Sequence, residues 1–205
     1  MRSRILTTLA FLVPALATPA AAQVPMQFGV MAGASFANFH GADADNSKTR
    51  TGFAAGGFLR LHTGIFAIEP ELLYVQKGAK LDVASDITGT LKLDYIEVPV
   101  LVKVMIATAD PALSPNIFAG PAVGFRANCQ LKGENGSGAS AQASCSDADV
   151  HVKSTDFSLV LGAGLDVRRL SFQGRYDLGL TKVGDSSTAN DIKNGAFLIT
   201  VGFSF

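Results

Sequence analysis

The sequence predicts an all-β fold, an eight-stranded antiparallel transmembrane up-and-down β-barrel, and three observations lead to this prediction. Apolar and polar residues alternate with a period of two along most of the chain, which is typical of β-strands. The alternating segments number eight, and short and long connections follow one another between them, as in membrane barrels. Charged residues within the segments lie opposite the bulky apolar face, so the apolar face is the one expected to contact lipid.

Residues 1–22 have the pattern of a secretory signal peptide. Two arginines within the first four residues precede an apolar run at 5–17, and three alanines at 20–22 stand ahead of Gln23. A basic start, a short apolar stretch and small residues at the cleavage position are the parts of such a signal. The alternative, a buried N-terminal helix, does not explain the cleavage pattern. We therefore expect residues 1–22 to be removed and residues 23–205 to form one barrel domain.

Composition indicates an apolar environment for the exported chain. Hydrophobic residues make up 48% and charged residues only 17%, whereas a soluble domain carries about a quarter charged residues. No apolar run of 18 residues follows the signal, so a spanning helix is not the explanation. Without the two arginines of the signal, 15 basic residues stand against 17 acidic ones, a net charge of −2. This balance leaves no broad basic field for nucleic acid.

Eight strands are expected, with ends defined to within two to four residues. They span residues 27–38, 52–62, 65–77, 90–105, 116–127, 155–168, 171–182 and 194–205. Each strand has one apolar face, directed outward. In chain order these faces include Phe28, Val30, Phe36; Phe53, Leu59, Leu61; Ile68, Leu72, Tyr74; Ile96, Val98, Val100, Val102, Val104; Phe125; Phe157, Leu159, Leu161, Leu165, Val167; Phe172, Tyr176, Leu178, Leu180; and Phe197, Ile199, Val201, Phe203, Phe205.

The opposite faces carry ten charged residues, five of each sign. They are Arg60, Glu69, Glu71, Glu97, Lys103, Arg126, Asp166, Arg168, Arg175 and Asp177. A charge facing lipid at mid-depth costs about 2–4 kcal/mol, so these side chains are expected in the lumen. An eight-stranded interior is filled by side chains, and buried charges must be paired. We expect a paired-charge network that fills the lumen; a narrow conductive path is the alternative.

Specific partners can be suggested for two of these charges. Glu97 is a candidate partner for Arg175 or Arg60, and Lys103 is one for Glu69 near the short-turn rim. Pro99 lies between Glu97 and Lys103 and cannot donate a ladder hydrogen bond. It is therefore a candidate for a bulge that changes which side chains face inward beyond it.

The connections separate into two kinds that collect at opposite rims. The short ones lie at 62–64, 107–115 and 169–170, and the long ones at 39–51, 78–89, 128–154 and 183–193. We expect both chain ends at the short-turn rim, on the periplasmic side, and the long loops outside.

Two cysteines, Cys129 and Cys145, flank a polar Gly- and Ser-rich segment of one long loop. An isolated pair this close in an exported protein predicts a loop disulfide. Metal binding is the weaker alternative, because two thiols do not complete a tetrahedral site.

Outward aromatic residues are expected at two heights, as in the girdles of membrane barrels. Those near the short turns are Phe28, Phe66, Phe172, Phe203 and Phe205, and those toward the long loops are Phe36, Phe53, Tyr74, Phe125, Phe157 and Phe197. Tyr176 lies in mid-strand and fits neither girdle.

Three phrases carry a family resemblance: PELLYVQKGAK at 70–80, LDYIEVPVLVK at 93–103 and NIFAGPAVGF at 116–125. Together they resemble the bacterial outer-membrane β-barrel family known as porin-family or PorT-like proteins, over about residues 27–205. The resemblance implies location in the bacterial outer membrane, with outer-membrane lipid as a partner. PorT-like relatives are associated with protein export in some bacteria. The terminal Phe205 resembles the C-terminal aromatic signal that the barrel-assembly machinery reads.

Chemistry-bearing residues give little support to an enzyme. His40 lies near Asp43 and Asp45 in one expected loop, but no nucleophile motif accompanies them. The acidic phrases GADADNSK and SCSDADVH lack the spacing of a calcium loop. We therefore expect no catalytic residue, no cofactor and no metal site. A surface-interaction role for the long loops, with an unknown protein partner, is the alternative to a purely structural barrel.

Overall fold

A computed structural model describes residues 25–40, 47–84, 87–110, 112–135, 140–147, 152–183 and 192–205. The predicted signal peptide lies outside these residues. Nine β-strands are formed by the described residues: β1 Met26–His40, β2 Ser47–Thr63, β3 Phe66–Ala84, β4 Ile87–Met105, β5 Leu113–Asn135, β6 Ser140–Ser144, β7 Thr155–Val167, β8 Leu170–Lys182 and β9 Lys193–Ser204. No helix in the described ranges is long and apolar enough to cross a membrane.

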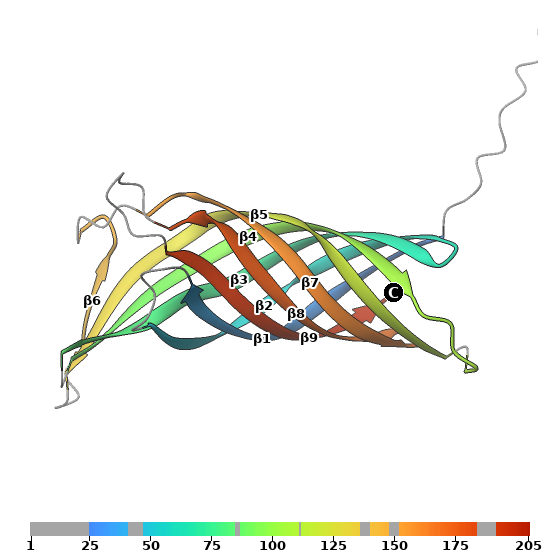
Figure 1. Ribbon diagram of the computed structural model, residues 1–205, viewed down its shortest axis with the longest axis horizontal. Coiled ribbons are helices and arrows are strands. Elements are labelled where there is room, and N and C mark those ends of the chain that lie inside the picture. Colours follow the sequence, from blue (N-terminus) through green and yellow to red (C-terminus); the bar gives the residue numbers. More distant parts are fainter. Residues whose placement is uncertain are drawn as a thin grey trace, which may run out of the picture.

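Eight of the strands close into a barrel, seen from the side in Figure 1. Neighbouring strands pair in the order β4-β3-β2-β1-β9-β8-β7-β5, every pairing is antiparallel, and a further β4–β5 pairing joins the two ends. The short strand β6 pairs with β5 beyond the β5–β7 register and stands outside the ring. The predicted eight-stranded antiparallel barrel is confirmed.

The short connections lie at one end of the barrel, here called the turn end. Gly64 has a φ of 64° between β2 and β3, and Arg168 has a φ of 55° between β7 and β8. Positive φ is the backbone geometry of tight hairpin turns, which glycine adopts without strain. The start of β1 and the C-terminus lie at this same end (Figure 1, right), as expected for an even number of strands.

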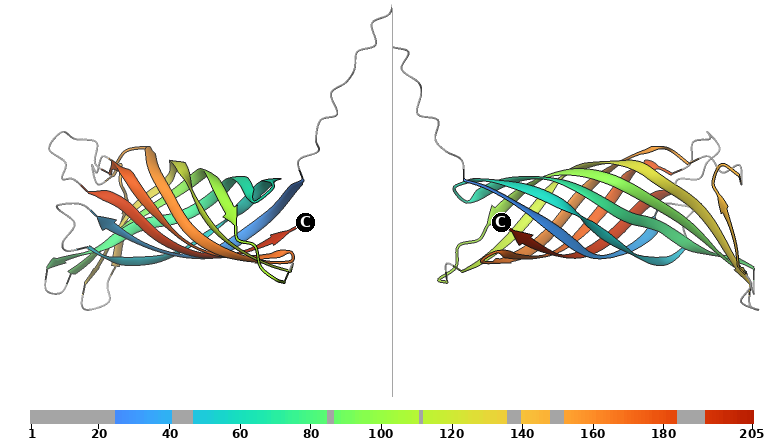
Figure 2. Two further views of the ribbon diagram at one scale, coloured as in Figure 1. Left: turned by 45° about the vertical axis from the view of Figure 1, so that its right-hand side comes forward. Right: turned by 180° about the vertical axis from the view of Figure 1, so that it is seen from behind.

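The opposite end, here called the loop end, has longer strands than the sequence predicts. β3 continues to Ala84 and β4 begins at Ile87, so most of the predicted loop 78–89 is strand. β5 continues to Asn135 and carries β6 along its edge. Figure 2 shows this extension of β2–β6 projecting beyond the rest of the barrel. The sequence of residues 78–89 is polar and contains glycine, so it indicated a loop. The segment is nevertheless strand: it lies past the apolar band, where side chains on the outer face no longer need to be apolar.

The barrel is apolar outside and polar inside. Phe28 and Leu72 are each 58% exposed on the outer face, whereas Glu69 and Asp177 are fully buried inside. A soluble barrel has the opposite distribution, so the outer face is suited to lipid.

Aromatic side chains cluster at both ends of the apolar surface. Phe28 stacks on Phe205 at a centroid distance of 5.4 Å near the turn end, and Phe53 lies 5.5 Å from Tyr74 toward the loop end. Tyr176 is paired in register with Phe197. A Cβ at Gly195 would lie 2.6 Å from the Tyr176 hydroxyl. Tyr176 therefore extends over Gly195 toward the loop end and joins the aromatic residues there.

Pro99 does not disturb the alternation of strand β4. Glu97, Pro99 and Leu101 are all buried, and the β4–β5 register is the same before and after the proline. The irregularity lies earlier, between Asp94 and Tyr95, where β5 contributes one extra residue. The prediction of a bulge at Pro99 is therefore wrong. Pro99 cannot donate a ladder hydrogen bond, but the residue pairs on either side of it keep the register of the two strands.

Candidate functional site

The lumen is filled by buried charged side chains. Seven carboxylates and five basic groups are buried among the described residues: Glu69, Glu71, Asp94, Glu97, Asp156, Asp166 and Asp177 with Arg50, Arg60, Lys77, Lys103 and Arg175. Most occupy alternate positions on β2, β3, β4, β7 and β8, because every second side chain of a barrel strand points inward. Asp94 is an exception to the inward direction, because it lies between Leu93 and Tyr95, which both face the interior. Buried ions must be paired and hydrogen-bonded to be tolerated.

Near the turn end, two basic groups converge on two carboxylates. Arg60 of β2 bonds Glu69 of β3, and its Nη1 lies 3.2 Å from Asp166 of β7. The Lys103 ammonium of β4 lies 2.6 Å from Glu69. Asn116 donates from its Nδ2 to Asp166 at 3.0 Å. Five strands thus contribute to one network at this level.

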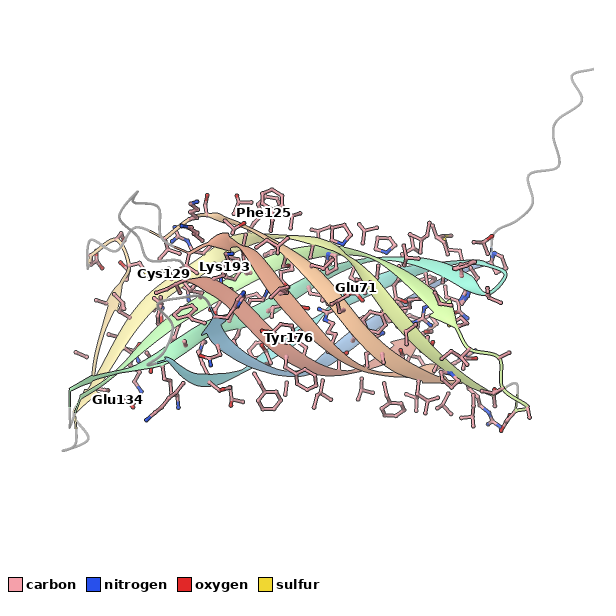
Figure 3. All side chains as sticks on the ribbon, in the orientation of Figure 1. Glu71, Phe125, Cys129, Glu134, Tyr176 and Lys193 are labelled. Atoms are coloured by element: carbon pink, nitrogen blue, oxygen red, sulfur yellow. A yellow bond between two sulfur atoms is a disulfide. The ribbon has the colours of Figure 1, made fainter. Side chains whose placement is uncertain are left out.

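A second network lies nearer the middle of the barrel. Arg175 of β8 bonds Glu71 of β3 at 2.5 Å, and its Nε lies 3.6 Å from Asp177. Lys77 of β3 bonds Glu97 of β4, and its Nζ lies 3.7 Å from Asp177. Figure 3 shows Glu71 within the barrel and Phe125 on its outer face.

Several of these contacts run directly across the lumen. In the ring of eight strands, β3 and β8 are four places apart, as are β2 and β7, so each pair is diametrically opposed. Glu71–Arg175 and Lys77–Asp177 join β3 to β8, and Arg60–Asp166 joins β2 to β7.

A fourth contact has the same geometry nearer the loop end. The Asn194 amide of β9 donates to the Tyr95 hydroxyl of β4 at 3.2 Å, and these two strands are also four places apart. The lumen is therefore crossed by side chains at several levels.

Beyond these networks, an apolar cluster fills the loop end of the interior. We call it the apolar cap: Phe39, Ala79, Leu91, Leu93, Tyr95, Cys145, Val152 and Val183, with Cys129, Leu131 and Ile192 packed against it.

The predicted disulfide joins Cys129 to Cys145, with a Cα–Cα distance of 5.5 Å. The backbone N–H of Cys145 also donates to the Cys129 carbonyl at 3.2 Å. Together these bonds hold the segment after β6 against β5. A hollow of about 280 Å³ next to the disulfide is lined by both cysteines, Arg126 and Ser144 among others.

The ten charges expected in the lumen do not all lie there. Eight are buried, but Arg126 is half-buried beside the disulfide, and Arg168 is exposed. Arg168 belongs to the β7–β8 turn because β7 ends one residue earlier than predicted, at Val167. A turn residue with positive φ does not follow the strand alternation, so its side chain lies outside the lumen.

Four buried charges were missed in the sequence: Arg50, Lys77, Asp94 and Asp156. Lys77 and Asp156 follow the same alternation as Glu69 and Asp166, so the pattern contained them. Arg50 and Asp94 form an ion pair at 3.5 Å beside register shifts in β2 and at the β4–β5 pairing. At a register shift, the alternation along the strand does not tell whether a side chain faces the lumen or the outside.

The partner suggested for Glu97 was wrong. Its partner is Lys77, on the neighbouring strand, in place of Arg175 or Arg60. Alternation identifies the face of a side chain but not its height relative to residues of other strands. The Lys103–Glu69 pair is present, as given above.

Within the described ranges, no group of three His, Cys, Asp or Glu residues could hold a metal ion. His62 lies 3.2 Å from the Gln27 side chain at the turn end. Asp43 and Asp45 lie outside the described residues.

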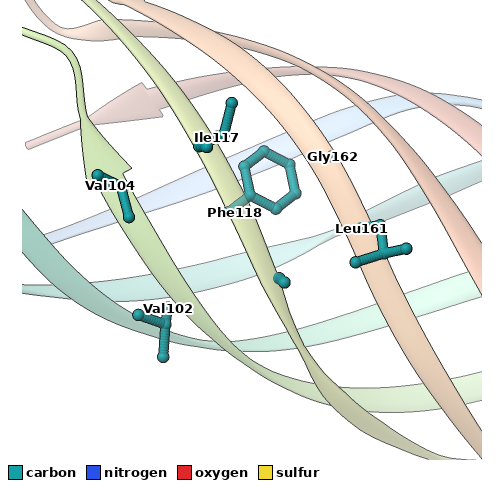
Figure 4. Close-up of a pocket in the computed structure, with 7 residues that line it drawn as sticks. Val102, Val104, Ile117, Phe118, Leu161 and Gly162 are labelled. Atoms are coloured by element: carbon teal, nitrogen blue, oxygen red, sulfur yellow. The ribbon is translucent and has the colours of Figure 1, made fainter.

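The outer wall has an apolar groove of about 440 Å³ across β4, β5 and β7 (Figure 4). Its floor is low at Ala119 and Gly162, and larger side chains, including Val102, Ile117 and Leu161, surround it. The groove opens on the apolar outer face of the barrel.

Comparison with known proteins gives a family and several distant structures. No curated protein matches the sequence. The Ail attachment invasion locus protein of Yersinia pestis is 15% identical, with a TM-score of 0.43 over 87% of this chain and 98% of that one. Neisserial surface protein A is 14% identical, with a TM-score of 0.47 over 87% and 97% of the two chains. The N-terminal β-barrel domain of Pseudomonas aeruginosa OprF is 16% identical, with a TM-score of 0.35 over 88% and 100%. The sequence profile described as "Outer membrane protein beta-barrel domain" matches residues 21–185.

Proposed function

Because the chain belongs to the outer membrane protein β-barrel domain family, we propose that it is a non-enzymatic outer-membrane protein whose lumen is closed. It would act through its rims and its outer wall and would conduct no solute. The observation that supports this proposal is the set of ion pairs between opposite strands, Glu71–Arg175, Lys77–Asp177 and Arg60–Asp166.

Energetics favour a closed lumen over a gated one. Separating one partner from a buried ion pair leaves an uncompensated charge and costs about 3–5 kcal/mol. A continuous path would require several such pairs to separate and the apolar cap to move. An eight-stranded barrel has little free width to accommodate those movements.

Single-channel recording in planar bilayers tests the proposal. The folded wild-type protein is expected to give no steady unitary current. The double variant Glu71→Ala with Arg175→Ala removes one pair that crosses the lumen. Fewer pairs then have to separate, so this variant is expected to show brief openings more often than the wild type. Leu72→Ala with Tyr176→Ala is the matched control. Leu72 directly follows Glu71 and Tyr176 directly follows Arg175, but both side chains lie on the outer face of the barrel.

Two outcomes would contradict the closed lumen. A steady current from the wild-type protein would support the narrow passive channel instead. An equal frequency of openings in the lumen variant and the outward control would show that the Glu71–Arg175 pair does not help to close the path.

Protein export is a separate candidate role that rests on the resemblance to PorT-like proteins alone. Measuring secreted proteins in a deletion strain tests it, with secretion restored by the wild-type gene. Unchanged secretion would remove this role without affecting the proposal for the lumen.

A further inference from the structure

The ladders between neighbouring strands are interrupted at three places where the register does not change. The β2–β3 pairing stops at Phe58 and resumes at Leu61, the β3–β4 pairing stops at Pro70 and resumes at Leu73, and the β4–β5 pairing stops at Pro99 and resumes at Val102. The other interruptions among the described strands coincide with register shifts. These three gaps therefore have a different cause.

Each of the three gaps contains one proline. By the register on either side, the facing residues are Leu59 with Pro70, Glu71 with Pro99, and Val100 with Pro121. Proline has no backbone N–H, so it cannot donate a hydrogen bond to the opposite strand. The gaps lie side by side from β2 to β5, and we call them together the proline seam.

The proline seam lies in the apolar band of the barrel. On its outer face, Leu72 is 58% exposed and Val100 is 42% exposed. Backbone groups in the hydrocarbon layer must be paired within the protein, because no water reaches them. Proline within a sheet is accordingly confined to edge strands, strand starts and bulges. Three prolines on neighbouring strands of a closed barrel depart from this rule, and such departures are expected at functional sites.

The side chains behind the seam differ from gap to gap. Behind the β2–β3 gap lies the buried charge of Arg60, and behind the β3–β4 gap lies that of Glu71. Behind the β4–β5 gap is an inner apolar cluster formed by Leu101, Phe118, Ala122 and Val160. An apolar molecule would meet a charge at the first two gaps, which is unfavourable. At the β4–β5 gap it would meet apolar side chains on both faces of the wall.

The apolar groove on the outer wall lies next to this β4–β5 gap. Val102 and Ala119 line the groove and form the first ladder pair after the gap. Phe118 lines the groove and also belongs to the inner apolar cluster. Figure 4 shows the Phe118 ring between β5 and β7, beside Gly162, where a Cβ would lie 2.4 Å from that ring. The groove and the inner apolar cluster therefore meet at Phe118.

We propose that this part of the wall binds an acyl chain of a bilayer lipid, which enters from the groove and reaches the inner apolar cluster through the β4–β5 gap. The groove is continuous with the apolar outer face, so a lipid acyl chain is the molecule that lies at its opening. Fewer ladder hydrogen bonds hold the strands together at the gap, so a local separation costs less there than in a fully paired wall.

The charged networks limit how far such a chain extends. The Lys103 ammonium lies 4.9 Å from the centroid of the Phe118 ring, so a chain that moved past Phe118 toward the turn end would meet a buried charge. The acyl-chain site therefore lies within the wall. It does not depend on the closed lumen, which the conductance measurement tests separately.

Photolabelling in vesicles tests the acyl-chain site. The folded protein is placed in phosphatidylcholine vesicles that contain a small fraction of the same lipid with a diazirine in the middle of one acyl chain. Mass spectrometry then identifies the labelled residues. The wild type is expected to be labelled at Leu101 and Ala122 of the inner apolar cluster. Leu73 and Leu198 are also buried, on the inner face of β3 and β9, and they are expected to stay unlabelled.

Two proline substitutions on β5 give a matched comparison. Pro121→Ala supplies an N–H opposite Val100, and it is expected to lower the labelling of the inner apolar cluster about fivefold, as one added ladder hydrogen bond would. Pro115→Ala makes the same change outside the seam, where the pairing with Leu165 is uninterrupted, and it is expected to leave the labelling unchanged. Heat-modifiable gel mobility establishes that each variant is folded.

Several outcomes would overturn the proposal. Label confined to outward residues such as Ile117 and Leu161 would show that lipid contacts the groove without entering the wall. Equal inner labelling of the two proline variants would exclude the seam as the entry. Loss of the inner label when a small amount of free fatty acid is added would indicate a free amphiphile as the occupant. A cross-linked dimer with an unlabelled groove would indicate a second copy of the chain.

Discussion

Lys77 of β3 is a buried cation between two carboxylates, one on the neighbouring strand β4 and one on β8 across the lumen. It bonds Glu97 on the adjacent strand and lies 3.7 Å from Asp177 across the lumen. A lysine at this depth is stable because both partners are fixed on strands, so the opposing charges are already in position when the barrel closes.

Replacing Lys77 is expected to be costly. Lys77→Met leaves two buried carboxylates without their cation, which costs about 3–5 kcal/mol of unfolding free energy. Adding Glu97→Gln should recover part of that loss. Urea unfolding in detergent micelles measures both changes, and Lys80→Met, at an exposed position of the same strand, should change stability by less than about 0.5 kcal/mol. Equal effects of the two lysine substitutions would contradict the buried ion pair as the cause.

Strand β6 is held by bonds of two kinds, its ladder with β5 and the Cys129–Cys145 disulfide. It has no partner on its outer edge within the described part of the chain. An edge strand of five residues contributes little stability by itself, so the disulfide is the stronger constraint on this segment.

Removing the disulfide is expected to release β6 but leave the barrel closed. In the chain-entropy treatment, closing a loop of about 15 residues contributes roughly 3 kcal/mol. Cys129→Ser with Cys145→Ser should therefore make residues near 140–147 sensitive to limited proteolysis, while heat-modifiable mobility stays unchanged. The reduced wild-type protein is the matched comparison. Loss of the folded band would show instead that the barrel depends on this bond.

Strand prediction from the sequence succeeded where both faces of a strand have a defined environment. Between lipid and lumen, each second residue of β7 or β8 must be apolar, so alternation identified these strands and the inward Arg175 and Asp177. Past the apolar band the outer face is polar, and the same reasoning interpreted residues 78–89 as a loop. Register shifts near Arg50 and Asp94 interrupt the alternation, so these two buried charges could not be predicted. The pairing of Glu97 with Lys77 depends on how β3 and β4 are aligned along the barrel axis, which the sequence of one strand does not define.

At the scale of the whole molecule, the first and last strands of the barrel, β1 and β9, pair with each other and bring Phe28 next to Phe205 at the turn end. Phe205 stacks on Phe28 of β1 and lies edge-on to Phe203 of β9 at 5.6 Å. The Phe205 backbone N–H donates to the Phe28 carbonyl at 2.9 Å. The last residue therefore lies at the β1–β9 seam, where it is exposed and accessible.

Deleting Phe205 is expected to separate assembly in cells from stability in vitro. If Phe205 is the signal read by the barrel-assembly machinery, the deletion should lower the folded fraction in outer membranes several-fold. Purified protein should still refold in detergent, because one exposed aromatic residue contributes little to the barrel. Phe205→Tyr retains the aromatic ring and should assemble normally. Equal losses in cells and in vitro would indicate a packing role only.

The contacts that cross the lumen also bear on how fast the barrel can come apart. Glu71 and Arg175 are 104 residues apart in sequence, and Arg60 and Asp166 are 106 apart. Contacts of such high contact order form late, since most of the chain must be in place before they are made. Interactions that form after the folding transition state slow unfolding more than they speed folding. We therefore expect the ion pairs across the lumen to act mainly on the rate of unfolding, so that the folded barrel persists for a long time once it has closed.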